Sequence, residues 1–129
     1  MASASRWPSL DKMTRNFADK LKQGDVAGVL ANFTPDAQSH LTFEPQMAAT
    51  PEAHRRYFEK NRKAAVEITQ GDWQKTGPRT AVGIGFWNWQ RPASPGITHA
   101  RWMIVAKRRP FSSRWRIYRL HSSVVPSAA

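Results

Sequence analysis

The sequence predicts an α+β domain, with helices in the first half of the chain and strands in the second. Apolar residues recur every three or four positions as far as Ala65 and every second position afterwards. Turns rich in Pro and Gly then divide the second half into four segments of strand length. The 129 residues suffice for one domain with one hydrophobic core.

The first predicted helix begins after Ser9, whose hydroxyl is a suitable N-cap, and residues 1–8 form an expected flexible leader. Gly24 is a natural helix stop. The apolar positions between these two residues are spaced by three, four and four, which is typical of one buried stripe on an amphipathic helix. They are Leu10, Met13, Phe17 and Leu21.

Two shorter helices are expected to follow, separated by a short strand. Asp25 is placed to cap a helix in VAGVLANF (26–33), and the sequence TPDA (34–37) predicts a turn. Residues 38–43 are predicted to form a short strand. A Thr-Pro pair at 50–51 then supplies a cap and a first helical position for the third helix.

The rest of the chain reads as four extended segments. Gly83 and Gly85 interrupt the second of them and predict a bulge or bend, as a strongly curved sheet requires. We expect a single domain over residues 9–126 and a short tail at 127–129. The four segments are VEITQGDW (66–73), RTAVGIGFWNWQ (79–90), ITHARWMIVAKR (97–108) and SRWRIYRLHSSVV (113–125).

The composition favours anionic partners. Lys and Arg number 20 against 9 Asp and Glu, which gives a formal net charge of +11. The chain has no cysteine, which excludes disulfides, thiolate metal sites and cysteine nucleophiles. No apolar run approaches the ~18 residues of a membrane span, so we expect a cytoplasmic protein. The four histidines lack metal-ligand spacing, and we expect neither a metal nor a cofactor.

The last two predicted strands carry a family resemblance. ARWMIVAKRR (100–109) and RWRIYRLHSSVVP (114–126) resemble the end of nuclear transport factor 2-like proteins, in particular the SnoaL-like group and the calcium/calmodulin-dependent protein kinase II association domain. Arg119 stands where members of that branch tend to carry the first of two histidines, and His121 matches the second. GDVAGVLANFTPDAQ (24–38) resembles the second helix of these proteins and the turn after it.

The resemblance implies a cone-shaped, cystatin-like fold in which three helices pack on a strongly curved, mostly antiparallel sheet. It also implies a homodimer or larger ring, and a pocket at the open end of the cone. Strict alternation places Arg119 and His121 on the face of Trp115 and Ile117. Four residues are therefore candidates for binding a small anionic ligand in this pocket: Arg101, Arg119, His121 and Tyr57.

A second expectation concerns the sheet face that the helices leave uncovered. Alternation separates Trp87 and Trp89 from Ile84 and Phe86. We predict that Trp87, Trp89 and Trp102 form an exposed apolar patch for association between subunits. A bulge in this strand, or a register shift of one residue, would instead bury the tryptophans.

Three functions remain open at this stage. The leading hypothesis is a non-catalytic or weakly catalytic, oligomerising and ligand-binding domain. The alternative is an isomerase, cyclase or dehydratase in which His121 works with Asp36 or Asp72. A nucleic-acid-binding accessory protein is the third hypothesis. For an acidic partner, the expected basic surface consists of Lys107, Arg108, Arg109, Arg114 and Arg116.

Overall fold

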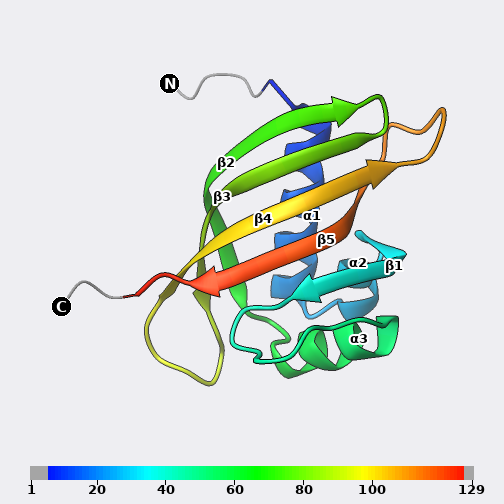
Figure 1. Ribbon diagram of the computed structural model, residues 1–129. Coiled ribbons are helices and arrows are strands. Elements are labelled where there is room, and N and C mark those ends of the chain that lie inside the picture. The colour runs from blue at the N-terminus through cyan, green and yellow to red at the C-terminus, as the bar shows by residue number, and fades with distance from the viewer. Residues whose placement is uncertain (1–5, 127–129) are drawn as a thin grey trace.

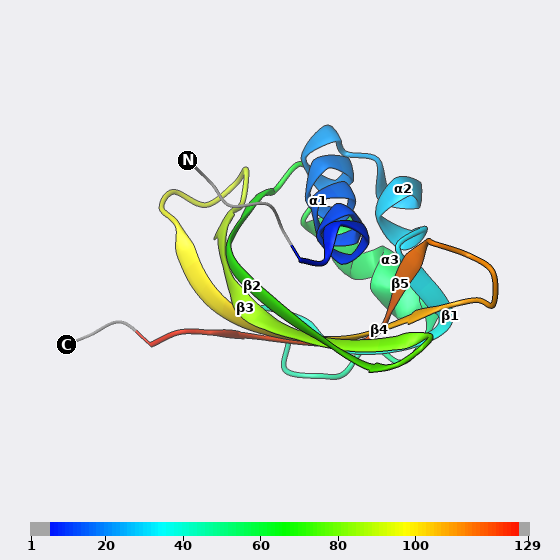
Figure 2. The ribbon, with the colours of Figure 1, turned by 90° about the horizontal axis from the view of Figure 1, so that it is seen from above.

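The computed structural model describes residues 6–126, in which helices cover the concave face of a curved five-stranded sheet (Figures 1 and 2). The predicted α+β class, with helices before the long strands, is confirmed. In chain order the elements are α1 (Pro8–Gln23), α2 (Val26–Leu30), β1 (Phe33–His40), α3 (Pro51–Lys60), β2 (Ala65–Gly77), β3 (Thr80–Gln90), β4 (Thr98–Arg108) and β5 (Trp115–Val124).

The helix starts follow the capping residues with one difference, and α2 ends at Leu30, three residues before the predicted end at Phe33, which begins β1. The Asp25 side chain accepts a hydrogen bond from the Gly28 amide, and Gly24 ends α1 in the left-handed conformation with φ of 78°. However, α1 begins at Pro8 and not after Ser9. Proline is favoured in the first turn because it lacks the N–H group that has no helical partner there. Of the predicted leader and tail, residues 1–5 and 127–129 lie outside the described residues.

The strand order in the sheet is β1-β5-β4-β3-β2. In the described sheet, β1 and β5 form the one parallel pair, and the other neighbouring strands are antiparallel. The predicted boundaries of β1 were wrong. The strand spans Phe33–His40, and its pairing with β5 is interrupted between Phe33 and Gln38. Pro35, which has no backbone donor, lies in this interruption, and an edge strand tolerates it. The expected turn at residues 34–37 is therefore an irregular part of the strand.

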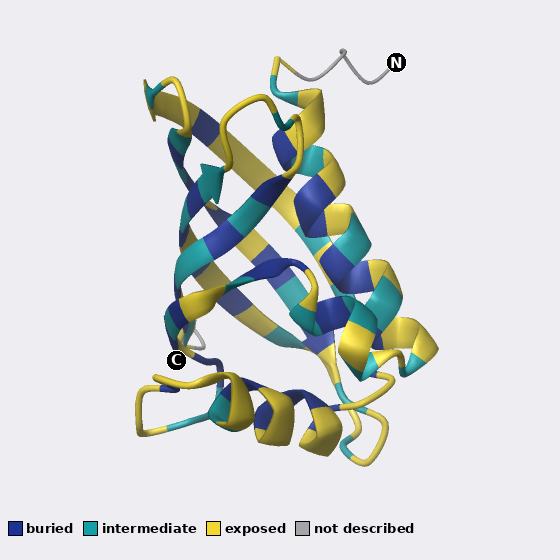
Figure 3. Ribbon diagram, turned by 90° about the vertical axis from the view of Figure 1, so that its right-hand side faces the viewer, coloured by how far each residue is buried: buried dark blue, intermediate teal, exposed yellow. Residues whose placement is uncertain are grey.

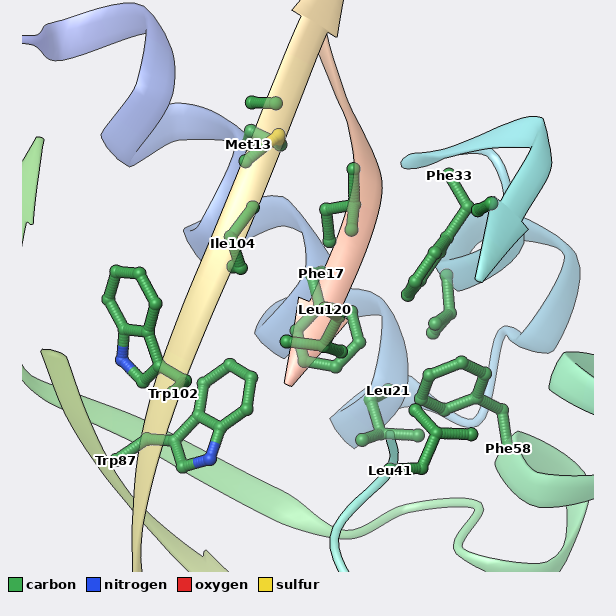
Figure 4. Close-up of a cluster of buried hydrophobic side chains, with 14 of the residues drawn as sticks. Met13, Phe17, Leu21, Phe33, Leu41, Phe58, Trp87, Trp102, Ile104 and Leu120 are labelled. Carbon is green, nitrogen blue, oxygen red and sulfur yellow. The ribbon is translucent and has the colours of Figure 1, made fainter. Parts of the chain in front are cut away.

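The tryptophans fill the concave side of the sheet, contrary to the prediction of an exposed patch. Trp87, Trp89 and Trp102 are only 1%, 2% and 2% exposed. Figure 3 shows buried and exposed residues alternating along the strands, and Figure 4 shows Trp87 and Trp102 in the buried cluster beneath α1. Phe17 of α1 stacks on Trp87 with ring centroids 5.8 Å apart.

Two glycines explain which face of β3 points inward. A Cβ atom on Gly83 would lie 2.5 Å from the ring of Trp73, and one on Gly85 would lie 2.6 Å from the ring of Trp102. Both distances are far below van der Waals contact, so the indole rings occupy the space that the absent side chains leave. Gly83 and Gly85 share the concave face with Trp87, which fixes the register of the whole strand.

Candidate functional site

The interior of the cone is occupied by side chains. Aromatic rings pack in succession from Trp73 through Trp102 and Trp87 to Trp89 and Tyr57, with centroid distances between 5.6 and 6.4 Å. This cluster fills the place where the resemblance implied a ligand pocket.

A short polar chain crosses this interior. The indole N–H of Trp87 donates to Ser122 Oγ over 3.0 Å, and the Ser122 hydroxyl is hydrogen-bonded to that of Thr42. Burial raises the pKa of Tyr57, an effect that the Thr42 hydroxyl partly opposes. Tyr57 is 4% exposed. The Thr42, Ser122 and Trp87 groups stabilise one another within the core. Tyr57 is a core residue whose hydroxyl has no hydrogen-bond partner among the described residues, and its side chain also lines a hollow of about 380 Å³ together with Leu41 and Ala48.

The other three predicted ligand residues lie on the opposite side of the sheet. The pairing of β4 with β5 shifts between Val105 and Ala106, where Tyr118 is an extra residue in β5. Because of this bulge, Arg119 and His121 point to the convex face, although Ile117 points inward. Arg101 is also exposed on the convex face. Hence these three residues do not form one pocket with Tyr57.

The candidate catalytic residues are not assembled either. Asp36 and Asp72 are exposed on β1 and β2, at opposite edges of the sheet. The aromatic neighbour of His121 is His40, with ring centroids 5.4 Å apart. Asp36 contacts Arg119 through its backbone carbonyl, at 3.3 Å from Nη1. None of the nine Asp and Glu residues, all within the described range, is buried.

The structure reveals a buried Ser–His pair that the sequence analysis missed. Ser39 donates to His54 Nε2 over 2.8 Å, and His54 Nδ1 donates to the Thr50 carbonyl over 2.7 Å. Ser39 is 0% and His54 2% exposed, and burial lowers the pKa of His54. The pair thus ties β1 to the start of α3 and has no accessible nucleophile. The sequence does carry a signal for the burial of His54: it lies on the apolar stripe of α3, three residues before Tyr57 and four before Phe58.

The convex face of the sheet carries an exposed apolar strip. Ile84, Phe86 and Met103 are 54%, 44% and 50% exposed. Ile84 and Met103 lie directly opposite each other on β3 and β4. Val82 and Val105, each half-buried, pair with each other two residues further along these strands.

This strip lies between a carboxylate on β2 and a pair of imidazoles on β5 and β1. In one row across the sheet, Asp72 of β2 is paired with Ile84, Ile84 with Met103, Met103 with His121, and His121 with His40 of β1. All five residues are exposed. The outer face thus changes from a carboxylate through two apolar side chains to two imidazoles.

The predicted basic surface divides into two parts. Lys107 lies over the Tyr118 ring at 3.5 Å, and Arg108 donates to the Ser112 carbonyl over 2.7 Å. The remaining members, together with Ser112, line a small hollow beside the β4–β5 connection: Arg109, Arg114 and Arg116.

Comparison with solved structures identifies the fold. The chain superposes with a TM-score of 0.82 on a protein from Xanthomonas campestris that is named as a candidate calcium/calmodulin dependent protein kinase II association domain, at 21% identity over 92% of this chain and 87% of that one. A candidate dehydratase of the NTF2-like family from Streptomyces avermitilis gives 0.80, at 15% identity over 94% and 96%. A ketosteroid isomerase-like protein from Erwinia carotovora gives 0.74, at 11% identity over 97% and 100%.

The chain therefore has the cystatin-like, nuclear transport factor 2-like fold, as the sequence resemblance implied. No protein-family model and no curated protein sequence matches it. Within residues 6–126, no helix is both long enough and apolar enough to cross a membrane.

Proposed function

We propose that this chain is a non-catalytic association domain, which forms a homodimer through the convex face of its sheet. The observation that carries this proposal is the exposed strip of Ile84, Phe86 and Met103 on a face that no helix covers. Exposed apolar surface of this kind marks interaction sites. The filled interior and the absence of a buried carboxylate among the described residues favour association over catalysis.

The size of the face fits a stable dimer. Five strands at about 4.8 Å spacing and about ten residues at about 3.3 Å rise span roughly 800 Å². This is about the area that each partner contributes to a typical specific interface.

Charge complementarity favours a second copy as the occupant. A two-fold axis between the two sheets, parallel to the strands, places β2 of each copy over β5 of the other. With the axis between β3 and β4, Ile84 lies over the partner's Met103 and Asp72 lies over the partner's His121. The same row of side chains is then complementary to itself.

Size-exclusion chromatography with light scattering tests the proposal. We expect a dimer for the unmodified chain in low and high salt, and a monomer for Ile84→Lys. Ile97→Lys is the matched control, because Ile97 is 58% exposed but precedes β4 in the β3–β4 connection. A monomeric unmodified chain, or equal behaviour of the two variants, would refute the proposal.

A further inference from the structure

The hollow beside the β4–β5 connection is lined mainly by cationic side chains, and hydrogen bonds hold one of them in place. It has a volume of about 140 Å³ and is lined by Arg109, Ser112, Arg114 and Arg116. The Arg114 amide donates to Ser112 Oγ over 3.1 Å, and Arg114 Nη2 donates to the Ala31 carbonyl over 2.8 Å. These bonds hold the connection against the end of α2.

Among the described residues, no ion pair offsets the positive charge of this hollow. The ion pairs of the described residues join Lys20 to Asp25 and Lys60 to Glu44, and neither involves these arginines. Partial burial lowers the pKa of Arg116, and the charges of Arg109 and Arg114 lower it further, although Asp36 acts in the opposite direction. The three guanidinium groups therefore repel one another in a space large enough for a tetrahedral anion.

A second, larger hollow of about 430 Å³ shares Arg114 and Arg116 with the first. Its remaining wall is mainly apolar and includes Leu30, Phe33 and Pro35. The two arginines thus connect a cationic hollow to a mainly apolar one, which Arg55 of α3 also lines. A ligand that spans both needs a compact anionic group and an adjoining apolar body.

We propose that these two hollows form one binding site for a small organic phosphomonoester. Guanidinium forks match phosphate oxygens in geometry and charge, so the phosphoryl group lies among Arg109, Arg114 and Arg116. The organic part lies against Phe33 and Leu30. The site lies at the β4–β5 connection beside the end of α2, and its lining shares no residue with the strip of Ile84, Phe86 and Met103, so it does not depend on the proposed dimer.

Isothermal titration calorimetry with phenyl phosphate and with inorganic phosphate tests this site. We expect phenyl phosphate to bind at least about tenfold more tightly, since the phenyl ring removes apolar surface from water. Arg109→Ala and Arg116→Met should each weaken phenyl phosphate binding about tenfold or more, because each removes charge-assisted hydrogen bonds to the phosphoryl group. Arg15→Ala is the control, since Arg15 is an exposed residue of α1 and lines neither hollow.

Two results would overturn the inference. Equal weakening in all three variants would mean that the net charge of +11 attracts the anion without a defined site. Equal affinities for phenyl phosphate and inorganic phosphate would remove the apolar hollow from the site. Arg109 lies in an exposed connection, so Arg109→Ala reports on binding even if Arg116→Met impairs folding. Because binding is measured and not assembly, a monomeric chain would leave this test valid.

Discussion

The charge pattern of the convex face makes a quantitative prediction about the register of the dimer. In the proposed two-fold arrangement Asp72 lies over the partner's His121, and the contact occurs twice. Asp72→Arg replaces two attractive contacts with two repulsive ones. Each contact at a partly solvated interface contributes about 1 kcal/mol, so the dimerisation free energy should weaken by about 2 kcal/mol or more. The dissociation constant should rise about 30-fold or more.

Basic side chains gather around His121 on the convex face. His40 lies beside His121, and Arg101 and Arg119 flank them on the same face. The partner's Asp72 is the carboxylate that offsets this accumulated charge. The unmodified chain should therefore dimerise more tightly than Asp72→Asn, which has no carboxylate to offer.

Analytical ultracentrifugation measures these dissociation constants. The double variant Asp72→Arg with His121→Asp reverses both charges and should recover most of the affinity. Asp19→Arg is the control, because it makes the same change in net charge on an exposed residue of α1. If Asp72→Arg weakens the dimer no more than Asp19→Arg, or if the double variant does not recover, the proposed axis is wrong even where a dimer exists.

Three further predictions concern stability and are checked by urea denaturation. Gly85→Ala should lower the free energy of unfolding by about 2 kcal/mol or more, because its Cβ would collide with the Gln70 carbonyl and the Trp102 ring, whereas Gly71→Ala should cost less. Ser122→Ala should lower the free energy of unfolding by about 2 kcal/mol, because the buried indole N–H of Trp87 then has no hydrogen-bond acceptor. The pKa of His54 is lowered on folding, so the unfolded chain binds the proton more readily; stability should fall as the pH falls below 6.5, and His54→Gln should lack this slope.

The helices were predictable because their signals are local. The stripe of α1 and the caps Asp25 and Thr50 act within one or two turns of the chain, and the structure confirms them. β1 was less predictable, because Pro35 and the residues around it resemble a turn. Its strand conformation depends on β5, about eighty residues away in the sequence. The local sequence pattern predicts such long-range strand pairing poorly.

The faces of the sheet were the part that the sequence analysis assigned wrongly, although a signal was present. β3 is apolar on both faces, so alternation alone does not decide which face is buried. Gly83 and Gly85 share a face with Trp87 and Trp89. A face with two glycines leaves room for rings from neighbouring strands, and this room is useful only in a packed interior. The bulge at Tyr118 had no comparable signal, and it changed the positions of Arg119 and His121.

These two features together decide where this chain can recognise another molecule. The indole rings that occupy the cone remove the interior as a binding volume, and the bulge moves the cationic side chains of β5 to the outside. The two surfaces that we propose for recognition lie outside the core: the convex face and the hollows beside the β4–β5 connection. The first offers apolar area with charges at its edges, which suits a second copy. The second offers concentrated positive charge next to an apolar wall, which suits a phosphorylated small molecule.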